Sequence, residues 1–296
     1  MSEQLEMITL YFGTFFFYLN RDYAILHPDK EAMMIKLIAT DMDGTFLDSD
    51  KRFDPEFIDI FYKLKEKGIK FVIASGNQYY RLYQKFLPLS EQMYFIAENG
   101  CYIAEGAAEL YCNTITHDNV ELIKTALAPY DNLFMIMCGR KGAYVLSRDK
   151  HFESLVRLHY CNYQFVDSFD HIDDEIMKIS INDPEEQIEK YLQALEPHLP
   201  VAVKVVTAGN MWMDIHNRDI NKGVGMRFLQ AIYEIEPDEC MAFGDQMNDY
   251  ELLQQVKYGY AMDNAVLPIK EIAYGTTRSN DEQGVLIKIK EVLDLA

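Results

Sequence analysis

The stretch Ile35–Asp50, IKLIATDMDGTFLDSD, decides the fold, because an apolar run delivers two carboxylates directly onto a glycine. Lys36–Thr40 has the pattern of a buried strand, and Asp41 and Asp43 follow it. In a parallel α/β sheet, ligands bind beyond the carboxyl ends of the strands. Two like charges side by side there are unfavourable unless a cation lies between them. The stretch therefore predicts a strand of a parallel sheet with a cation site at its end.

The D-x-D-G pattern has two other interpretations. An EF-hand calcium loop fails, because placing Gly44 at the sixth position of such a loop puts Ala39, which has no ligating oxygen, at the first. An ordinary surface turn stays open, since Gly44 permits a sharp turn and Thr45 can tie it by a hydrogen bond.

Both ends of the chain alternate apolar runs with helical periods, which implies a parallel sheet with right-handed crossovers. Before the middle of the chain, the pattern predicts a helix at 55–67, strands at 69–74 and 94–97, and a hairpin of 101–104 with 109–112. After Asp219, it predicts helices at 224–233, 249–256 and 283–293, and strands at 240–243 and 258–261.

The middle of the chain has strands whose faces alternate between apolar and polar, which is typical of an open α+β sheet half covered by helices. Predicted helices are 119–128, 152–160 and 184–195, and predicted strands are 133–138, 143–147, 177–181, 201–206 and 211–215. The fold class is therefore α/β, with a doubly wound parallel-sheet core assembled from residues 34–114 and 218–296, and an inserted α+β domain at 115–217.

Residues 1–33 are interpreted as an extension outside the catalytic fold. Their apolar run Ile8–Leu19 is too short to span a bilayer, and the acidic MSEQLE before it makes a poor secretory signal. A short anchor or a partner-binding strand is the alternative.

The 296-residue chain has a formal charge of −19, which argues against nucleic acid and anionic membranes as partners. An anionic substrate would need local cations, from a metal or from a few lysines. The five cysteines are odd in number and form no CxxC pair, so a reducing, cytoplasmic compartment is expected.

Three more polar groups follow strands or open helices. Ser75 and Gly76 follow the strand 69–74 and could hold phosphate oxygens, GDQMND (Gly244–Asp249) follows the strand 240–243, and Lys222 lies in the opening turn of a helix. Each signal is weak alone. Together, Asp41, Asp43 and Asp245 supply the oxygen ligands that Mg²⁺ prefers, while Ser75, Lys222 and Asn248 can hold phosphate oxygens.

This set resembles the haloacid dehalogenase superfamily of Mg²⁺-dependent phosphotransferases, with DMDGT, Ser75, Lys222 and GDQMND as its four motifs. The insertion is similar to the type IIB cap of the Cof-type subfamily. TDMDGTFL, GIKFVIASGNQYY and FIAENG look most like the bacterial sugar phosphatases of that subfamily. In many relatives an arginine follows Ser-Gly, whereas Asn77 stands here.

The resemblance implies a mechanism. Asp41 would be the nucleophile that forms an aspartyl-phosphate, and Asp43 the general acid and then base. Asp41, Asp245 and the backbone carbonyl of Asp43 would bind Mg²⁺, with Asp249 behind them. The phosphoryl group would be held by the side chains of Ser75, Lys222 and Asn248 and by the amides of Met42 and Gly76.

The expected function is Mg²⁺-dependent hydrolysis of small sugar phosphates by a monomer or weak homodimer. A phosphomutase of the phosphomannomutase type and a non-catalytic sugar-phosphate sensor are the alternatives. A phosphoaspartate receiver is disfavoured, because receivers are much shorter and carry no large cap.

Overall fold

The computed structural model describes residues 34–146 and 149–295, so the extension expected at 1–33 lies outside the described residues. Among these residues, no helix has both the length and the hydropathy that spanning a bilayer requires.

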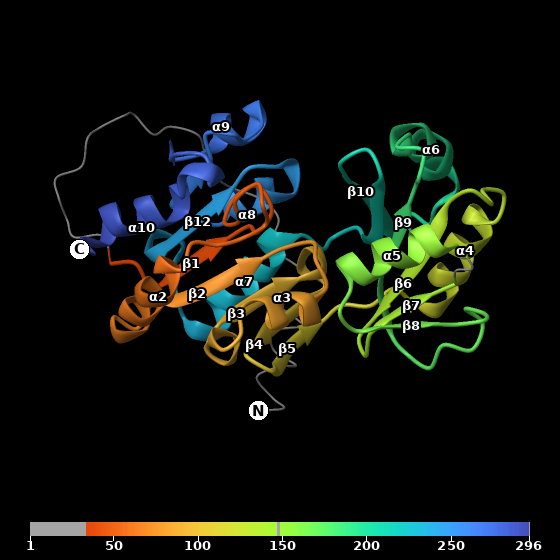
Figure 1. Ribbon diagram of the computed structural model, residues 1–296, viewed down its shortest axis with the longest axis horizontal. Coiled ribbons are helices and arrows are strands. Elements are labelled where there is room, and N and C mark those ends of the chain that lie inside the picture. Colours follow the sequence, from red (N-terminus) through yellow and green to blue (C-terminus); the bar gives the residue numbers. More distant parts are fainter. Residues whose placement is uncertain (1–33, 147–148, 296) are drawn as a thin grey trace. The chain divides into compact units, whose positions relative to one another are not determined.

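The core is one eight-stranded sheet that interleaves strands from both ends of the chain, as the red, orange and blue ribbons show (Figure 1). The strand order is β14-β13-β12-β1-β2-β3-β4-β5, parallel from β14 to β3 and antiparallel from there to β5. The first five strands are β1 (Leu37–Thr40), β2 (Lys70–Ala74), β3 (Tyr94–Ala97), β4 (Tyr102–Glu105) and β5 (Ala108–Cys112). The last three are β12 (Cys240–Gly244), β13 (Tyr258–Ala261) and β14 (Gly275–Thr276). The doubly wound core predicted from the sequence is confirmed.

Helices of the core bury apolar faces against this sheet. In α2 the residues Phe57, Ile60, Phe61 and Leu64 are buried at helical spacing, and the ring of Phe57 lies 4.9 Å from that of Phe71 in β2. The core helices are α2 (Glu56–Glu66), α3 (Tyr79–Lys85), α7 (Lys222–Tyr233), α8 (Tyr250–Gln254), α9 (Leu267–Ile272) and α10 (Gly284–Leu293).

The inserted cap is a second sheet of six strands in the order β10-β11-β9-β6-β7-β8, antiparallel except for the β7–β8 pair. Its strands are β6 (Phe134–Gly139), β7 (Ala143–Val145), β8 (Tyr163–Phe165), β9 (Ile176–Asn182), β10 (Val203–Ala208) and β11 (Trp212–Asn217). Its helices are α4 (His117–Leu127), α5 (Lys150–His159) and α6 (Ile188–Leu195).

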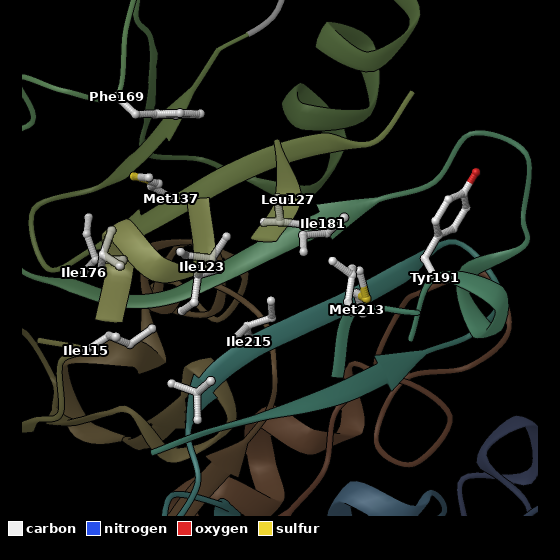
Figure 2. Close-up of a cluster of buried hydrophobic side chains, with 14 of the residues drawn as sticks. Ile115, Ile123, Leu127, Met137, Phe169, Ile176, Ile181, Tyr191, Met213 and Ile215 are labelled. Atoms are coloured by element: carbon white, nitrogen blue, oxygen red, sulfur yellow. The ribbon is translucent and has the colours of Figure 1, made fainter. Parts of the chain in front are cut away.

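One face of the cap sheet is apolar and packs against α4 and α6. Figure 2 shows side chains of helix and sheet in this cluster, among them Ile123, Ile181 and Ile215. Alternation along β9 and β11 places Lys178, Ser180, Asp214 and His216 on the opposite face. The opposite face is therefore mixed: it is polar along β9 and β11, whereas Ile136 and Cys138 of β6 belong to a second apolar cluster that includes Phe152 and Val156 of α5.

Several element bounds differ from the sequence-based expectation. The helix expected from 184 begins at Ile188, because the Asp183 carboxylate accepts hydrogen bonds from the amides of Glu185 and Gln187, and Glu186 has a φ of 58°. The helix expected at 249–256 is shorter in the structure, where α8 spans Tyr250–Gln254. The short elements β8, α9 and β14 were not predicted, because two to six residues carry too little periodicity.

The two connections between core and cap lie side by side. Asn217 donates its side-chain N–H groups to the side-chain oxygen of Asn113 at 2.7 Å and to the carbonyl of Thr114 at 2.9 Å. The domain boundaries at 114/115 and 217/218 stay predictions.

Candidate active site

The loop after β1 brings the first motif against the loop after β12. The amide of Asp41 donates to the carbonyl of Phe243 at 3.0 Å, and the Thr45 hydroxyl donates to Asp245 Oδ1 at 2.7 Å. Gly44 has a φ of +84°, and a Cβ added to it would lie 2.6 Å from Asp245 Oδ2. Only glycine fits there without displacing the carboxylate.

Three carboxylates converge at this point. Oxygens of Asp41, Asp245 and Asp249 all lie within 4.8 Å of one another, and all three residues are buried. Burial raises the pKa of Asp41 well above its ordinary value and also raises that of Asp245, with further contributions from the neighbouring carboxylates. The ionised cluster is thus unfavourable without positive charge.

Lys222 provides part of that charge. It is the first residue of α7, after the N-cap Asn221, whose side chain accepts from the Val224 amide. Its buried Nζ lies 2.6 Å from Asp41 Oδ1 and 2.6 Å from Asp249 Oδ1. Burial lowers the pKa of Lys222, but the two carboxylates outweigh it and the net direction is upward. The lysine is therefore charged.

Three carboxylates and one ammonium leave a net negative charge that a divalent cation would neutralise, and carboxylate oxygens are the ligands that Mg²⁺ prefers. Asp249 is already engaged, because its Oδ1 accepts from Lys222 and its Oδ2 from the amides of Asp245 and Gln246. Asp41 and Asp245 are therefore the carboxylates better placed to ligate a cation directly, and the donor set fits Mg²⁺.

Asp43 lies beside this cluster and has different partners. Its Oδ2 accepts from Asn77 Nδ2 at 2.7 Å, and its Oδ1 lies 2.9 Å from Lys51 Nζ. Burial raises the pKa of Asp43, but the Lys51 ammonium and the Asn77 amide outweigh it and hold that pKa below its ordinary value. With 38% of its side chain exposed, Asp43 remains open to solvent.

Ser75 is buried at the end of β2, and its Oγ accepts from both the amide of Asn77 at 3.2 Å and Asn77 Nδ2 at 3.1 Å. Asn77 thus links Ser75 to Asp43, a connection that sequence reasoning missed. The only signal was its position directly after Ser75-Gly76 in the second motif.

The remaining predicted residues are near but make no such contacts. Met42 is fully buried in the loop after β1, and its carbonyl accepts from the amides of Phe46 and Leu47. Asn248 is half-buried in the turn Met247–Asp249, next to Asp249.

The cap also reaches this site. Lys178 of β9 donates to the carbonyl of Gly76 at 2.8 Å, and Asp214 of β11 accepts from Asn99 Nδ2 at 3.1 Å. Lys178 was not among the predicted site residues, although a lysine inside the otherwise neutral strand segment IMKISIN was a usable signal.

Comparison with known proteins gives a consistent result. A family model described as haloacid dehalogenase-like hydrolase matches residues 38–289. The 5-amino-6-(5-phospho-D-ribitylamino)uracil phosphatase YbjI of Escherichia coli (strain K12) is 34% identical over 263 residues, covering 88% of this chain and 97% of its own.

Solved structures agree. SMU.1108c from Streptococcus mutans UA159 has a TM-score of 0.80 and 30% identity, covering 88% of this chain and 99% of its own. The HAD subclass IIB sugar phosphatase BT4131 has a TM-score of 0.72 at 21% identity, covering 86% and 98%, which bears on the fold alone. With a family model that spans most of its length and a relative named as a phosphatase at this identity, the chain belongs to the haloacid dehalogenase-like hydrolase family, as a phosphatase with a Rossmann-like core and an inserted cap.

Proposed function

We propose that this protein is a Mg²⁺-dependent phosphatase that hydrolyses phosphate monoesters of small sugars and sugar-like polyols through an aspartyl-phosphate on Asp41. The observation that carries the proposal is the buried group of Asp41, Asp245 and Asp249, held by the single ammonium of Lys222. Such a group suits a divalent cation and, with it, an incoming phosphate dianion. A bound Mg²⁺ would supply charge neutralisation and polarise the phosphoryl oxygens.

In the first half-reaction, a carboxylate oxygen of Asp41 attacks phosphorus. Lys222 binds Asp41 Oδ1, which leaves Oδ2 as the attacking atom. The new bond joins Asp41 to phosphorus, the bond from phosphorus to the substrate oxygen breaks, and that oxygen leaves with a proton from Asp43. An ionised carboxylate needs no separate base for this attack.

In the second half-reaction, Asp43 accepts a proton from the water that attacks the phosphorylated Asp41, and inorganic phosphate leaves. The contacts of Asp43 with Lys51 and Asn77 favour its ionised form, which is the form required at this stage. For the first stage Asp43 must carry a proton, and the negative charge of a bound phosphate monoester raises its pKa in that direction.

The transferring phosphoryl group is held by Ser75, Lys222 and Asn248 together with the amides of Met42 and Gly76. The buried hydroxyl of Ser75 supports its share in this role, because Asn77 already donates to its oxygen twice and its proton is left to donate. Asp245 and the carbonyl of Asp43 complete the cation ligands beside Asp41, with Asp249 behind them. Loss of one such electrostatic donor typically costs ~10²–10³ in rate.

The substrate class follows from the sequence resemblance and is compatible with the relatives. YbjI is named for a substrate with a phosphorylated ribityl chain, which is a polyol phosphate monoester like a reduced sugar phosphate. Both substrates carry a phosphate on a hydroxylated carbon chain, which the polar side chains of β9 and β11 in the cap would meet. We therefore expect activity on this class as a whole.

A reducing compartment suits the protein, because all five cysteines are free thiols. Together with the acidic charge, this supports a cytoplasmic location, and we propose further that the enzyme acts on small molecules as a monomer or weak homodimer.

The deciding experiment measures phosphate release from hexose, pentose and ketose phosphates and from 5-amino-6-(5-phospho-D-ribitylamino)uracil, with Mg²⁺ and with EDTA. Hydrolysis that needs Mg²⁺ and no bisphosphate activator supports the proposal. Transfer to a second sugar position would indicate a phosphomutase, and binding without turnover across the panel would indicate a sensor.

A further inference from the structure

Lys178 is a buried lysine of the cap that contacts the core. It lies in β9, is 3% exposed, and belongs to a strand whose seven residues are all buried. Its Nζ donates to the Gly76 carbonyl at 2.8 Å and to Asp214 Oδ2 at 2.9 Å, and it lies 2.9 Å from Glu98 Oε2. The Glu98 contact is an ion pair without hydrogen-bond alignment. Burying an ammonium is costly unless such partners surround it.

The core side of this contact is a strained turn. Glu98 and Asn99 both have positive φ values, 53° and 56°, a left-handed region that residues with a side chain seldom adopt. The turn supports the loop after β2, because the amide of Glu98 donates to the Asn77 carbonyl and that of Asn99 to the Ser75 carbonyl, both at 3.1 Å. The loop is thus held from one side by this turn.

Lys178 holds the same loop from the other side. Its ammonium binds the oxygen of the peptide between Gly76 and Asn77, and the N–H of that peptide donates to Ser75 Oγ at 3.2 Å. A cation on the oxygen polarises a peptide and strengthens its N–H as a donor. The chain of contacts therefore runs from a cap ammonium to the hydroxyl that faces the phosphoryl site.

We propose that Lys178 is a positioning residue for the phosphoryl group, which acts through the Gly76–Asn77 peptide on the orientation of the Ser75 hydroxyl. The inference rests on the proposed phosphatase function and adds a link between the cap and the chemistry. Because the contacts of Lys178 with Gly76 and Glu98 join cap to core, the loop is fully supported only when the cap is docked. Lys178 acts on a residue that would contact the phosphoryl group of the substrate, so its effect on kcat/KM should not depend on the leaving group.

The test compares Lys178→Met with Lys124→Met. Lys124 is a cap lysine of α4 whose ion-pair partners, Glu121 and Asp170, also lie in the cap, so its loss does not touch the core. Both variants are assayed with Mg²⁺ on p-nitrophenyl phosphate and on a hexose 6-phosphate. Loss of a group that orients an active-site residue typically costs ~10–100-fold. We expect this loss of kcat/KM for Lys178→Met, equal on both substrates, and no loss for Lys124→Met.

A double-mutant cycle with Ser75→Ala isolates the route. If Lys178 acts through Ser75, Lys178→Met should reduce kcat/KM little further in a protein that already carries Ser75→Ala. If the two residues act independently, the fold-losses in kcat/KM of the single variants should multiply in the double variant. Multiplying losses, or a loss that differs between the two substrates, would overturn the proposal. Wild-type protein without Mg²⁺-dependent turnover would instead remove the proposed function itself.

A readout independent of activity is available, because Trp212 is the only tryptophan of the chain. Its ring lies 5.4 Å from that of His159, which Arg81 of the core contacts at 3.2 Å. Acrylamide should quench Trp212 fluorescence more in Lys178→Met than in Lys124→Met or wild type, and unchanged quenching would contradict the cap-to-core link. If Lys178→Met fails to fold, Asp214→Asn serves instead, with a smaller loss that is again equal on both substrates.

Discussion

The hydroxyl of Thr45 donates to Asp245 Oδ1 at 2.7 Å, although 200 positions separate the two residues in the chain. This bond joins the loop after β1 to the loop after β12, which are neighbouring strands of the core sheet. The carboxylate cluster therefore forms only when both ends of the chain have paired, and the cap between them does not contribute a carboxylate to it.

Asp41→Asn is expected to abolish hydrolysis and leave the fold intact. The amide cannot attack phosphorus, and the substitution removes a buried carboxylate whose raised pKa indicates an unfavourable charge. Without Mg²⁺, thermal unfolding should therefore occur at a temperature at least as high as for wild type. Addition of Mg²⁺ should raise that temperature in wild type only. Near-wild-type turnover by a clean preparation would contradict the nucleophile assignment.

Asp43→Asn is expected to trap a phosphoenzyme or to turn over very slowly. The amide keeps a polar contact with Asn77 but cannot take a proton from water in the second half-reaction. Rapid-quench measurement of acid-stable protein-bound phosphate would detect the trapped species. If burst and steady-state rate both match wild type, Asp43 has no acid–base role.

Gly44→Ala and Gly68→Ala form a matched pair. Both glycines have positive φ values, +84° and +72°, so both substitutions carry a similar backbone strain of ~1–2 kcal/mol. Only at Gly44 would the new Cβ meet a side chain, that of Asp245, whereas nothing lies within 4 Å at Gly68. We expect weakened Mg²⁺ activation for Gly44→Ala alone, measured as the Mg²⁺ concentration for half-maximal rate. Equal Mg²⁺ dependence in the two variants would argue against Asp245 as a ligand.

Lys222→Met should destabilise the protein by ~3–5 kcal/mol, because it leaves the buried carboxylates of Asp41 and Asp249 without their ammonium. Lys290→Met is the control, since it removes a surface ion pair with Glu56 that is worth at most ~1 kcal/mol. Urea unfolding in EDTA measures both losses. Equal losses in the two variants would show that Lys222 does not stabilise the cluster.

His216 predicts a pH dependence of stability. Burial lowers the pKa of His216 to about 4 in the folded protein, whereas the pKa of a histidine in the unfolded chain is about 6.5. Between these two pH values the unfolded chain is protonated at His216 and the folded protein is not. The contribution of His216 to the free energy of unfolding is therefore fully present above about pH 6.5 and decreases as the pH falls toward about 4. Between pH 7.5 and 5.0 the loss should be about 2 kcal/mol.

Urea unfolding of His216→Phe should lack this share of the pH dependence, whereas His198→Gln, at an exposed histidine, should retain it. A wild-type slope in His216→Phe would assign the pH dependence to other groups.

The carboxylate cluster was predictable because each of its parts is local in the sequence. A buried strand followed by Asp41, and another followed by Asp245, can be recognised without knowing how the strands pair. Parallel topology then places both at one edge of the sheet. The same local reasoning placed Lys222 in the opening turn of a helix, and in the structure Lys222 is the first residue of α7.

The contacts of Lys178 and Asn77 could not be predicted in the same way. Lys178 acquires its core partners Gly76 and Glu98 only when the cap meets the core, and the lysine inside its strand marks the position as unusual without indicating which residues it contacts. Asn77 bonds to Asp43 because of the loop conformation after β2, which the strained Glu98–Asn99 turn imposes from elsewhere in the chain. These features depend on tertiary packing and not on periodicity.

The adjacent crossings tied by Asn217 to Asn113 and Thr114 have an evolutionary consequence. A segment whose entry and exit points touch can be exchanged as a cassette, since its removal leaves ends that a short bridge can rejoin. Selectivity in this architecture can accordingly diversify by replacing the middle of the gene, provided that the new segment keeps a cation at the position of Lys178, while the core carboxylates and Lys222 are inherited without change.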